Sequence, residues 1–525
     1  MKHMKKLAGL VLALVMAFAM TMTAFAANVT VPNELSGHTF KAYQIFTGTQ
    51  AVSEGALGDV EWGNGINSDA FLVALKNDTT VGNTFTNCKT ASDVATALGG
   101  ISDDLNAAEI VAKWAYANKK GDGIQLISGD NNNLADGYYL IVDATEGVSG
   151  TDDALNKALL QVTGNIEITK KTDKPSVEKK VKEDDKYQGT DYGAGYNDVA
   201  DYNMGDAVPF KLIGKVPDMT YYDTYKYIFH DTMSNGLTLN ENSVHVYVVD
   251  SKTEAGTPEK EITNYFTITK GDHALTVSCD DIKTISGVEA GKYIIVEYTA
   301  TLNQNAVVGL DGNPNKVYLE YSNNPNQGGE GETGRTPEDK VIVFTYELDT
   351  TKVDGENSNT KLEGAEFKLK NEADKWVIVD TNGNVTGWAE TEAEGSTLRS
   401  GADGLFKVIG LDDGTYYLKE TKAPAGYNLL KDEITVVISA TTANGQNWTD
   451  GQASSALTKL DVTADGVAGT GNATTGVAGI TVANNKGATL PETGGIGTTI
   501  FYVLGSILVI GAAVALITRR RMSKH

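Results

Sequence analysis

Apolar and polar residues alternate along most of the chain between residues 27 and 489. The clearest stretches are "SVHVYVVD", "KYIIVEYTATL", "KVYLEY", "VIVFTYEL" and "TYYLKET". Because successive side chains of a strand point to opposite faces, this alternation predicts strands with one buried face. Runs rich in Gly, Asn and Asp, such as "DTNGNVTG", "GADG" and "LDDG", separate these stretches and predict turns. The pattern therefore predicts a mainly β protein.

Two breaks divide this β-rich region into three parts. One is the lysine-rich "ITKKTDKPSVEKKVKEDDK" near residue 172, and the other is "NNPNQGGEGETGRTPEDK" at 323–340. The resulting parts, 27–171, 172–335 and 336–489, each have the size of an ordinary domain. Short strands separated by turns predict tandem immunoglobulin-like β-sandwich domains. The helical periodicity of "ASDVATAL" and "LNAAEIVAKWAYANKK" adds helices to the first domain.

The two ends of the chain have the patterns of a targeting segment and a membrane segment. Residues 1–26 combine a basic start, an apolar run and the small-x-small sequence Ala24-Phe25-Ala26, which predicts a cleaved signal peptide. Residues 496–517 carry no charge and are long enough to span a bilayer as a helix. The basic residues within 518–525 predict a cytoplasmic tail. We therefore expect an exported protein held at the cell surface.

Composition narrows the class of protein further. The formal net charge is −24 at pH 7, and such a surface repels nucleic acid and anionic lipid, which argues against nucleic-acid binding. The two cysteines, Cys88 and Cys279, lie far apart in the sequence, and we expect buried, unpaired thiols. The chain has no H-E-x-x-H, C-x-x-C or G-x-S-x-G motif. We therefore expect no metal, no cofactor and no hydrolase activity.

A polar pentapeptide stands immediately before the apolar C-terminal segment. Its residues are Leu490, Pro491, Glu492, Thr493 and Gly494. The succession of pentapeptide, apolar span and basic tail resembles proteins processed by sortase transpeptidases, whose sorting signal is L-P-x-T-G. The resemblance implies that a sortase cysteine attacks the carbonyl carbon of Thr493 and releases Gly494 onward, which leaves an acyl-enzyme. The acyl group then passes to an amine of the cell-wall peptidoglycan or to a lysine of another protein.

Further stretches resemble the major shaft pilins of sortase-assembled Gram-positive fimbriae. "TYYLKETKAPAGYN" and "KLEGAEFKL" are similar to Cna B-type domains, and "KPSVEKKV", "FHDTMSNGLTL" and "YLEYSNNP" are similar to the middle domain of these pilins. The resemblance implies tandem Cna A/B-type sandwiches and a structural, non-enzymatic subunit of a covalent pilus that serves adhesion or colonisation. The implied partners are a sortase, identical subunits joined head to tail, minor pilins, peptidoglycan and host surface molecules. A monomeric adhesin anchored to peptidoglycan is the alternative.

In this family, Lys and Asn side chains condense into an internal isopeptide bond with the help of an Asp or Glu. Burial favours the reaction because it lowers the pKa of a lysine and keeps a carboxyl group neutral. Residues that share the inner face of neighbouring strands are the candidates. In the third domain these are Lys352 and Asn484, with Glu420 assisting. Asn485 points the other way and is the fallback.

The same reasoning applies to the other two domains. In the second domain it predicts a bond between Lys179 and Asn323 with Asp231 assisting, and Glu297 is an alternative acid. In the first domain Asp143, within "GYYLIVD", takes a position like that of the assisting acid. No matching Lys and Asn accompany it, so we predict no bond there.

Shaft pilins also carry a Tyr-Pro-Lys motif at the end of the first domain, whose lysine attacks the acyl-enzyme of the neighbouring subunit. The corresponding stretch here is "GNIEITKKTDKPS", in which Lys171 takes the position of the motif lysine. Thr169 and Lys170 replace the Tyr-Pro pair. This departure from the motif leaves Lys170 and Lys174 as alternatives to Lys171.

Overall fold

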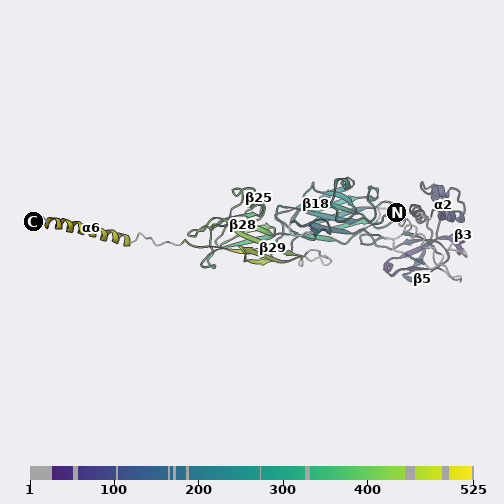
Figure 1. Cartoon of the computed structure of the whole chain (residues 1–525). Helices are drawn as coiled ribbons and strands as arrows, with labels where there is room; N and C mark the ends of the chain where they lie inside the picture. Colours follow the sequence, from purple (N-terminus) through teal and green to yellow (C-terminus); the bar gives the residue numbers. More distant parts are fainter. Residues whose placement is uncertain are drawn as a thin grey trace, which may run out of the picture.

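The computed structural model of the chain describes residues 27–522 except 51–56, 102–103, 156, 163–165, 169–172, 185–188, 272, 326–331, 444–455 and 488–495. Three β-rich bodies follow one another along one long axis, and helix α6 (Ile496–Met522) stands apart at the far end (Figure 1). This arrangement confirms the predicted series of β domains. The signal peptide and the sorting pentapeptide lie outside the described residues.

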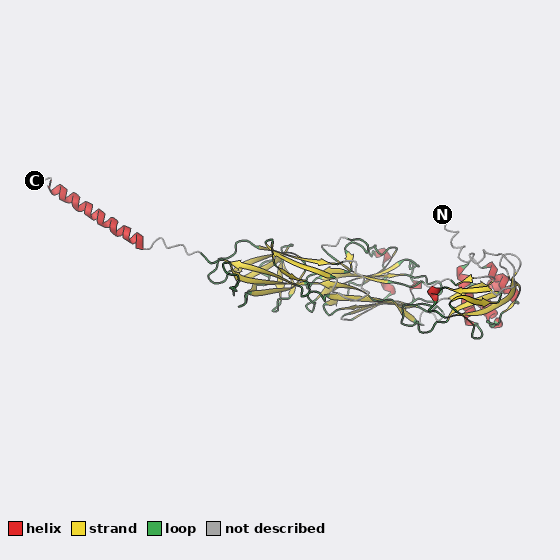
Figure 2. Ribbon diagram, turned by 90° about the horizontal axis from the view of Figure 1, so that it is seen from below, coloured by secondary structure: helices red, strands yellow, loops and turns green. Residues whose placement is uncertain are grey.

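The first domain combines two sheets with a group of helices. Figure 2 shows that the α-helices other than α6 gather at this end of the molecule. The larger sheet has the order β3-β2-β6-β7 with β4 beside β2, and the smaller one has the order β5-β1-β8. Helix side chains such as Phe71 and Phe85 pack with Leu140 of the larger sheet, as the helical periodicity predicts. The strands are β1 (Ala27–Val31), β2 (Phe40–Gln50), β3 (Leu57–Trp62), β4 (Ile124–Leu126), β5 (Gly129–Leu134), β6 (Gly137–Asp143), β7 (Lys157–Val162) and β8 (Ile166–Glu167).

The helices of the first domain begin where the sequence offers capping residues. The Thr90 hydroxyl accepts a hydrogen bond from the Asp93 backbone, and the Asp93 side chain accepts one from the Thr90 backbone, which forms a capping box. Asp104 caps the next helix in a similar way. The helices are α2 (Ser68–Asn77), α3 (Gly82–Phe85), α4 (Ala91–Gly100) and α5 (Leu105–Ala117), with a short 3-10 turn at η1 (Asn33–Leu35).

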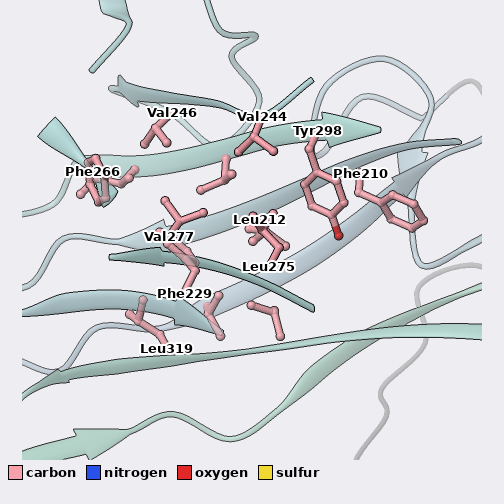
Figure 3. Packing of buried hydrophobic residues seen from close by; sticks show 14 of the residues in the cluster. Phe210, Leu212, Phe229, Val244, Val246, Phe266, Leu275, Val277, Tyr298 and Leu319 are labelled. Atoms are coloured by element: carbon pink, nitrogen blue, oxygen red, sulfur yellow. The ribbon is translucent and has the colours of Figure 1, made fainter. Parts of the chain in front are cut away.

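The middle domain is a sandwich of two sheets. One has the order β10-β9-β12-β18-β14 with β15 also beside β18, and the other has the order β11-β21-β19-β13-β17-β16 with β20 beside β19. Figure 3 shows part of the core between them, with Phe210, Leu212 and Phe229 among its members. The strands are β9 (Val177–Lys182), β10 (Tyr196–Asn197), β11 (Val199–Asp201), β12 (Ala207–Lys215), β13 (Tyr227–Met233), β14 (Leu237–Leu239), β15 (His245–Val249), β16 (Thr267–Lys270), β17 (Ala274–Cys279), β18 (Tyr293–Leu302), β19 (Asn313–Ser322), β20 (Thr333–Arg335) and β21 (Asp339–Phe344). Short 3-10 turns stand at η2 (Pro258–Lys260), η3 (Thr263–Tyr265) and η4 (Ile282–Thr284).

The third domain is a second sandwich, which begins at β22. Its sheets have the orders β27-β22-β33-β32 and β25-β24-β23-β28-β29-β30-β31, with β26 beside β23. The first and last long strands of the domain, β22 and β33, pair in parallel. The strands are β22 (Tyr346–Asp354), β23 (Glu366–Asn371), β24 (Trp376–Val379), β25 (Val385–Ala389), β26 (Leu398–Arg399), β27 (Leu405–Leu411), β28 (Gly414–Lys422), β29 (Ile434–Thr442), β30 (Leu457–Ala464), β31 (Val467–Ala468), β32 (Thr470–Asn472) and β33 (Val477–Asn484).

The junction between the middle and third domains lies later in the chain than the sequence breaks predict. The expected division after residue 335 falls before β21, which pairs with β19 and β11 of the middle domain. Only Thr345 separates β21 from β22. Val199, Met204 and Phe344 of the middle domain belong to the same buried apolar cluster as the core of the third. The described residues of the polar run, which include β20 and the start of β21, therefore belong to the middle domain, and the true junction is packed.

Two further features agree with the sequence. Cys88 lies buried in the first domain and Cys279 in the middle domain, and neither forms a disulfide. Helix α6 includes a segment, Thr499–Met522, that is long and apolar enough to cross a membrane. The apolar side chains of α6 are exposed in the isolated chain, as expected for a segment that faces lipid.

Candidate functional site

The third domain brings Lys352, Glu420 and Asn484 together in its core. They lie on β22, β28 and β33, and all three side chains are buried. Lys352 Nζ lies 3.9 Å from Glu420 Oε1, and Asn484 Nδ2 donates a 2.9 Å hydrogen bond to Glu420 Oε2. Parallel pairing sets Lys352 opposite Val482 in β33, whose carbonyl accepts a 3.1 Å hydrogen bond from Lys352 Nζ, and Asn484 follows two residues later on the same face of the strand. Asn485 is exposed and takes no part.

The surroundings of this cluster suit a condensation between the lysine and the asparagine. Burial lowers the pKa of Lys352 to about 8, although Glu420 opposes the shift, so neutral amine is available near neutral pH. Asn484 Nδ2 is also held by the Asn428 carbonyl at 2.6 Å, whereas Asn484 Oδ1 has no hydrogen-bond partner among the described residues. The amide is therefore fixed by its nitrogen beside an acid and an amine.

The middle domain contains a second buried cluster, which differs from the expected one. Lys179 Nζ donates hydrogen bonds to Asp231 Oδ2 and, at 2.9 Å, to the Tyr298 hydroxyl. Asn315 Nδ2 donates to the same hydroxyl at 2.8 Å. All four side chains are buried. Burial lowers the pKa of Lys179 and raises the pKa of Asp231, so both groups are shifted toward their neutral forms.

Asn323, the expected partner of Lys179, does not lie in this cluster. Antiparallel pairing sets Asp231 opposite Val317, whereas it sets Tyr321, two residues before Asn323, opposite Tyr227 at the other end of β13. Both asparagines are buried, so the alternation identifies the inward face of β19 correctly. The alternation does not fix how far along that face a residue stands, and for this reason the structure places the expected partner outside the Lys179 cluster.

Asn323 instead connects the middle domain to the first. Its Nδ2 donates hydrogen bonds to the carbonyls of Val148 at 2.9 Å and Asp153 at 3.0 Å, and its own carbonyl accepts one from the Leu155 backbone at 2.9 Å. The Thr151 carbonyl also accepts a hydrogen bond from the Arg335 backbone N–H at 3.0 Å. The segment 148–155 of the first domain is thus fastened to the end of the middle sandwich.

The alternative acid, Glu297, serves another lysine. It lies on β18 opposite Lys211 of β12, and the two side chains approach to 3.4 Å between Lys211 Nζ and Glu297 Oε1. Lys211 Nζ also donates to the carbonyls of Tyr192 and Glu254. Since neighbouring residues of a strand face opposite sides, Glu297 points away from the cluster that contains Tyr298.

In the first domain, Asp143 contacts a histidine and a threonine. Asp143 Oδ2 lies 2.7 Å from His38 Nδ1, and Asp143 Oδ1 accepts a hydrogen bond from the Thr145 hydroxyl at 2.6 Å. His38 Nε2 lies 3.2 Å from Asp153. This acid therefore takes part in a histidine contact.

Of the candidate acceptor lysines, Lys174 lies at the junction of the first and middle domains. Lys174 forms a 3.0 Å ion pair with Asp152 and a hydrogen bond to its carbonyl. Lys170 and Lys171 lie outside the described residues, as does the sorting pentapeptide. The described chain resumes at Asp173.

Comparison with known proteins identifies the class. Residues 204–325 match the Gram-positive pilin backbone subunit 2, Cna-B-like domain, residues 347–452 match a prealbumin-like fold domain, and residues 482–524 match the LPXTG cell wall anchor motif. The trypsin-resistant surface T6 protein of Streptococcus pyogenes serotype M6 is 27% identical over 379 residues, which is 61% of this chain and 65% of the T6 protein. The match therefore spans less than two thirds of that relative.

A solved structure shares the fold, and another matches about half of the chain. The T6 backbone pilin of serotype M6 Streptococcus pyogenes, described as a modular three-domain structure, aligns with 90% of this chain and all of its own, with a TM-score of 0.50 and 18% identity. The pilus 2b backbone protein of group B streptococcus is 27% identical, and the match covers 55% of this chain and 97% of that one with a TM-score of 0.39.

Together, the fold and the anchor motif define a cell-wall-anchored surface protein built from tandem β sandwiches. Within that class, the middle domain matches the pilin backbone subunit model, and the chain is similar to the backbone, or shaft, pilins of Gram-positive bacteria.

Proposed function

We propose that this chain is the repeating subunit of a covalent pilus. A sortase cleaves between Thr493 and Gly494 and joins the Thr493 carbonyl carbon to the side-chain amine of Lys171 in the next subunit. The match of residues 204–325 to pilin backbone subunits, in a chain that ends in an LPXTG anchor, carries this proposal. Repetition of such a head-to-tail contact gives an open filament. We propose minor pilins and host surface molecules as further partners because the chain resembles shaft pilins.

The survival of high-mass species in boiling detergent tests the proposal. Cell-wall extracts boiled in detergent and blotted for the chain should contain a ladder of high-mass bands, because the links between subunits are covalent. A single band of monomer size would contradict a polymer and favour the peptidoglycan-anchored monomeric adhesin.

We further propose that two internal crosslinks stabilise the subunit. The geometry supports Lys352 with Asn484 in the third domain, assisted by Glu420, and Lys179 with Asn315 in the middle domain, assisted by Asp231. In each reaction the amine nitrogen bonds to the amide carbon, the bond from that carbon to its nitrogen breaks, and ammonia leaves with one proton from the amine. The reaction occurs once in each molecule and is self-processing rather than enzymatic turnover.

In a variant that cannot form the third-domain bond, the buried Lys352 should make the stability of the fold depend on pH. In Asn484→Ala, Lys352 stays a free amine whose pKa in the folded domain is about 8, against 10.5 for an ordinary lysine. Unfolding takes up a proton between these two values, so the stability of the folded variant should rise with pH across this range. Melting temperatures measured from about pH 8 to pH 10 should show the rise. The double variant Lys352→Met, Asn484→Ala should lack it, and equal slopes in the two variants would contradict the assignment.

A further inference from the structure

One hydroxyl group connects every reacting side chain of the middle-domain cluster. The Tyr298 hydroxyl accepts hydrogen bonds from Lys179 Nζ at 2.9 Å and from Asn315 Nδ2 at 2.8 Å, and it donates one to Asp231 Oδ1 at 3.0 Å. A tyrosine hydroxyl has one proton to donate and two lone pairs, so these three bonds use its full capacity. The hydroxyl therefore touches the nucleophilic nitrogen, the leaving nitrogen and the assisting acid.

We propose that Tyr298 is a catalytic residue of the middle-domain crosslink and carries the proton from the acid to the departing nitrogen of Asn315. The proposal rests on the proposed bond between Lys179 and Asn315. It assigns to Tyr298 a step that Asp231 is not placed to perform alone, because the hydrogen bond of Asn315 Nδ2 goes to the hydroxyl rather than to the carboxyl group.

The surroundings keep the hydroxyl in place and protonated. The Tyr298 ring stacks on Phe210, with ring centroids 5.4 Å apart and an interplanar angle of 22°, and Figure 3 shows both rings within the packed core. Burial, reinforced by the nearby Asp231, raises the pKa of Tyr298 well above its usual value. A group that holds its proton this firmly serves as a donor only if it regains a proton in the same step.

The proposed step meets that requirement. The neutral Lys179 amine attacks Asn315 Cγ. Tyr298 passes its hydroxyl proton to Asn315 Nδ2 and takes up in turn the carboxyl proton of Asp231, and Asp231 regains a proton from the attacking nitrogen of Lys179. The bond from Cγ to Nδ2 then breaks, ammonia leaves, and both Tyr298 and Asp231 end in the states in which they began. One bond has formed, one has broken, and neither oxidant nor reductant is needed.

The third domain provides an internal comparison, because its acid contacts the leaving nitrogen directly. Asn484 Nδ2 donates to Glu420 Oε2 at 2.9 Å and to the Asn428 carbonyl. The acid there can deliver the proton to the leaving nitrogen without an intermediary. Loss of the Tyr298 hydroxyl should therefore affect the middle-domain bond and leave the third-domain bond unchanged.

The test uses the whole exported chain with Tyr298→Phe, which removes the hydroxyl and keeps the ring. The crosslink is followed over time after synthesis by intact mass, since each bond removes one ammonia, and by mass spectrometry of the linked peptides. We expect the wild type to lose two ammonia molecules, and the variant to form the Lys179–Asn315 bond about a hundredfold more slowly while the third-domain bond forms normally. If the variant formed the middle-domain bond at the wild-type rate, the role of Tyr298 would be overturned, whereas the proposed crosslink itself would stand.

Two controls separate the possible failures. Tyr227→Phe removes another buried hydroxyl of the same domain, one that donates to the Lys215 carbonyl at 3.0 Å, and it should crosslink normally. Equal slowing in this variant would attribute the effect to loosened packing and overturn the proposal. A wild-type chain without the Lys179–Asn315 bond would overturn the middle-domain crosslink itself, and with it the role of Tyr298.

Discussion

Replacing Glu420 by glutamine should leave the third domain without its crosslink and lower its melting temperature by on the order of 15 °C. Glutamine keeps the size of the side chain but cannot exchange a proton with Lys352 and Asn484. The missing bond would otherwise close a loop of more than about 100 residues, and loop-entropy estimates for a disulfide of that span give about 5 kcal/mol. The loss is large because the bond joins β22 and β33, the first and last long strands of the domain.

Intact mass and calorimetry check this result together. The variant should retain the mass of the ammonia that the wild type loses from this domain, and the same domain should unfold at the lower temperature. Glu392→Gln is a matched control, because Glu392 forms a half-exposed ion pair with Lys419 in the same domain and should cost less than about 1 kcal/mol. A Glu420→Gln chain that still loses the ammonia would contradict the role of the acid.

Replacing Lys171 by arginine should abolish the covalent ladder and leave monomers. Arginine keeps the positive charge, but its guanidinium group stays protonated and does not act as the attacking amine. Lys174→Arg should leave the ladder intact, because arginine can keep the ion pair with Asp152 that the structure places there. Lys170→Arg should likewise have no effect.

The three variants decide among the candidate lysines. Blots of boiled cell-wall extracts should show loss of the ladder in one variant only. Loss in Lys174→Arg with a normal ladder in Lys171→Arg would move the acceptor to Lys174. A normal ladder in all three would place the acceptor outside this stretch.

The sequence predicts the third-domain cluster well because three separate strands each restrict it. Lys352, Glu420 and Asn484 are in phase with the apolar residues of their own strands, and the alternation therefore places all of them in the core. In the middle domain the same argument identifies Lys179 and Asp231. The argument does not identify the asparagine of the cluster, because Asn315 and Asn323 are in phase along the same stretch of chain. Only the pairing of β13 with β19 distinguishes their positions.

Features that depend on contacts between distant parts of the chain were not accessible in this way. A polar, glycine-rich run is typical of a linker, yet the run before β21 lies within the middle domain because β21 completes a sheet with β19. The link between Asn323 and the segment 148–155 joins two domains and has no local signal. The role of Tyr298 depends on three hydrogen bonds from different strands, whereas its alternation pattern indicates only a core tyrosine.

The single residue between β21 and β22 determines how such a fibre would bear tension. A pull between Lys171 and Thr493 would enter at β9, pass through the Lys179–Asn315 bond into β19 and β21, and continue through Thr345 into β22. From there the Lys352–Asn484 bond would carry it to β33 and the sorting tail. The first domain precedes Lys171 in the chain and lies outside this path. It stays fastened to the middle sandwich through the segment 148–155 but would carry none of this load, so its unfolding would not lengthen the path between Lys171 and Thr493.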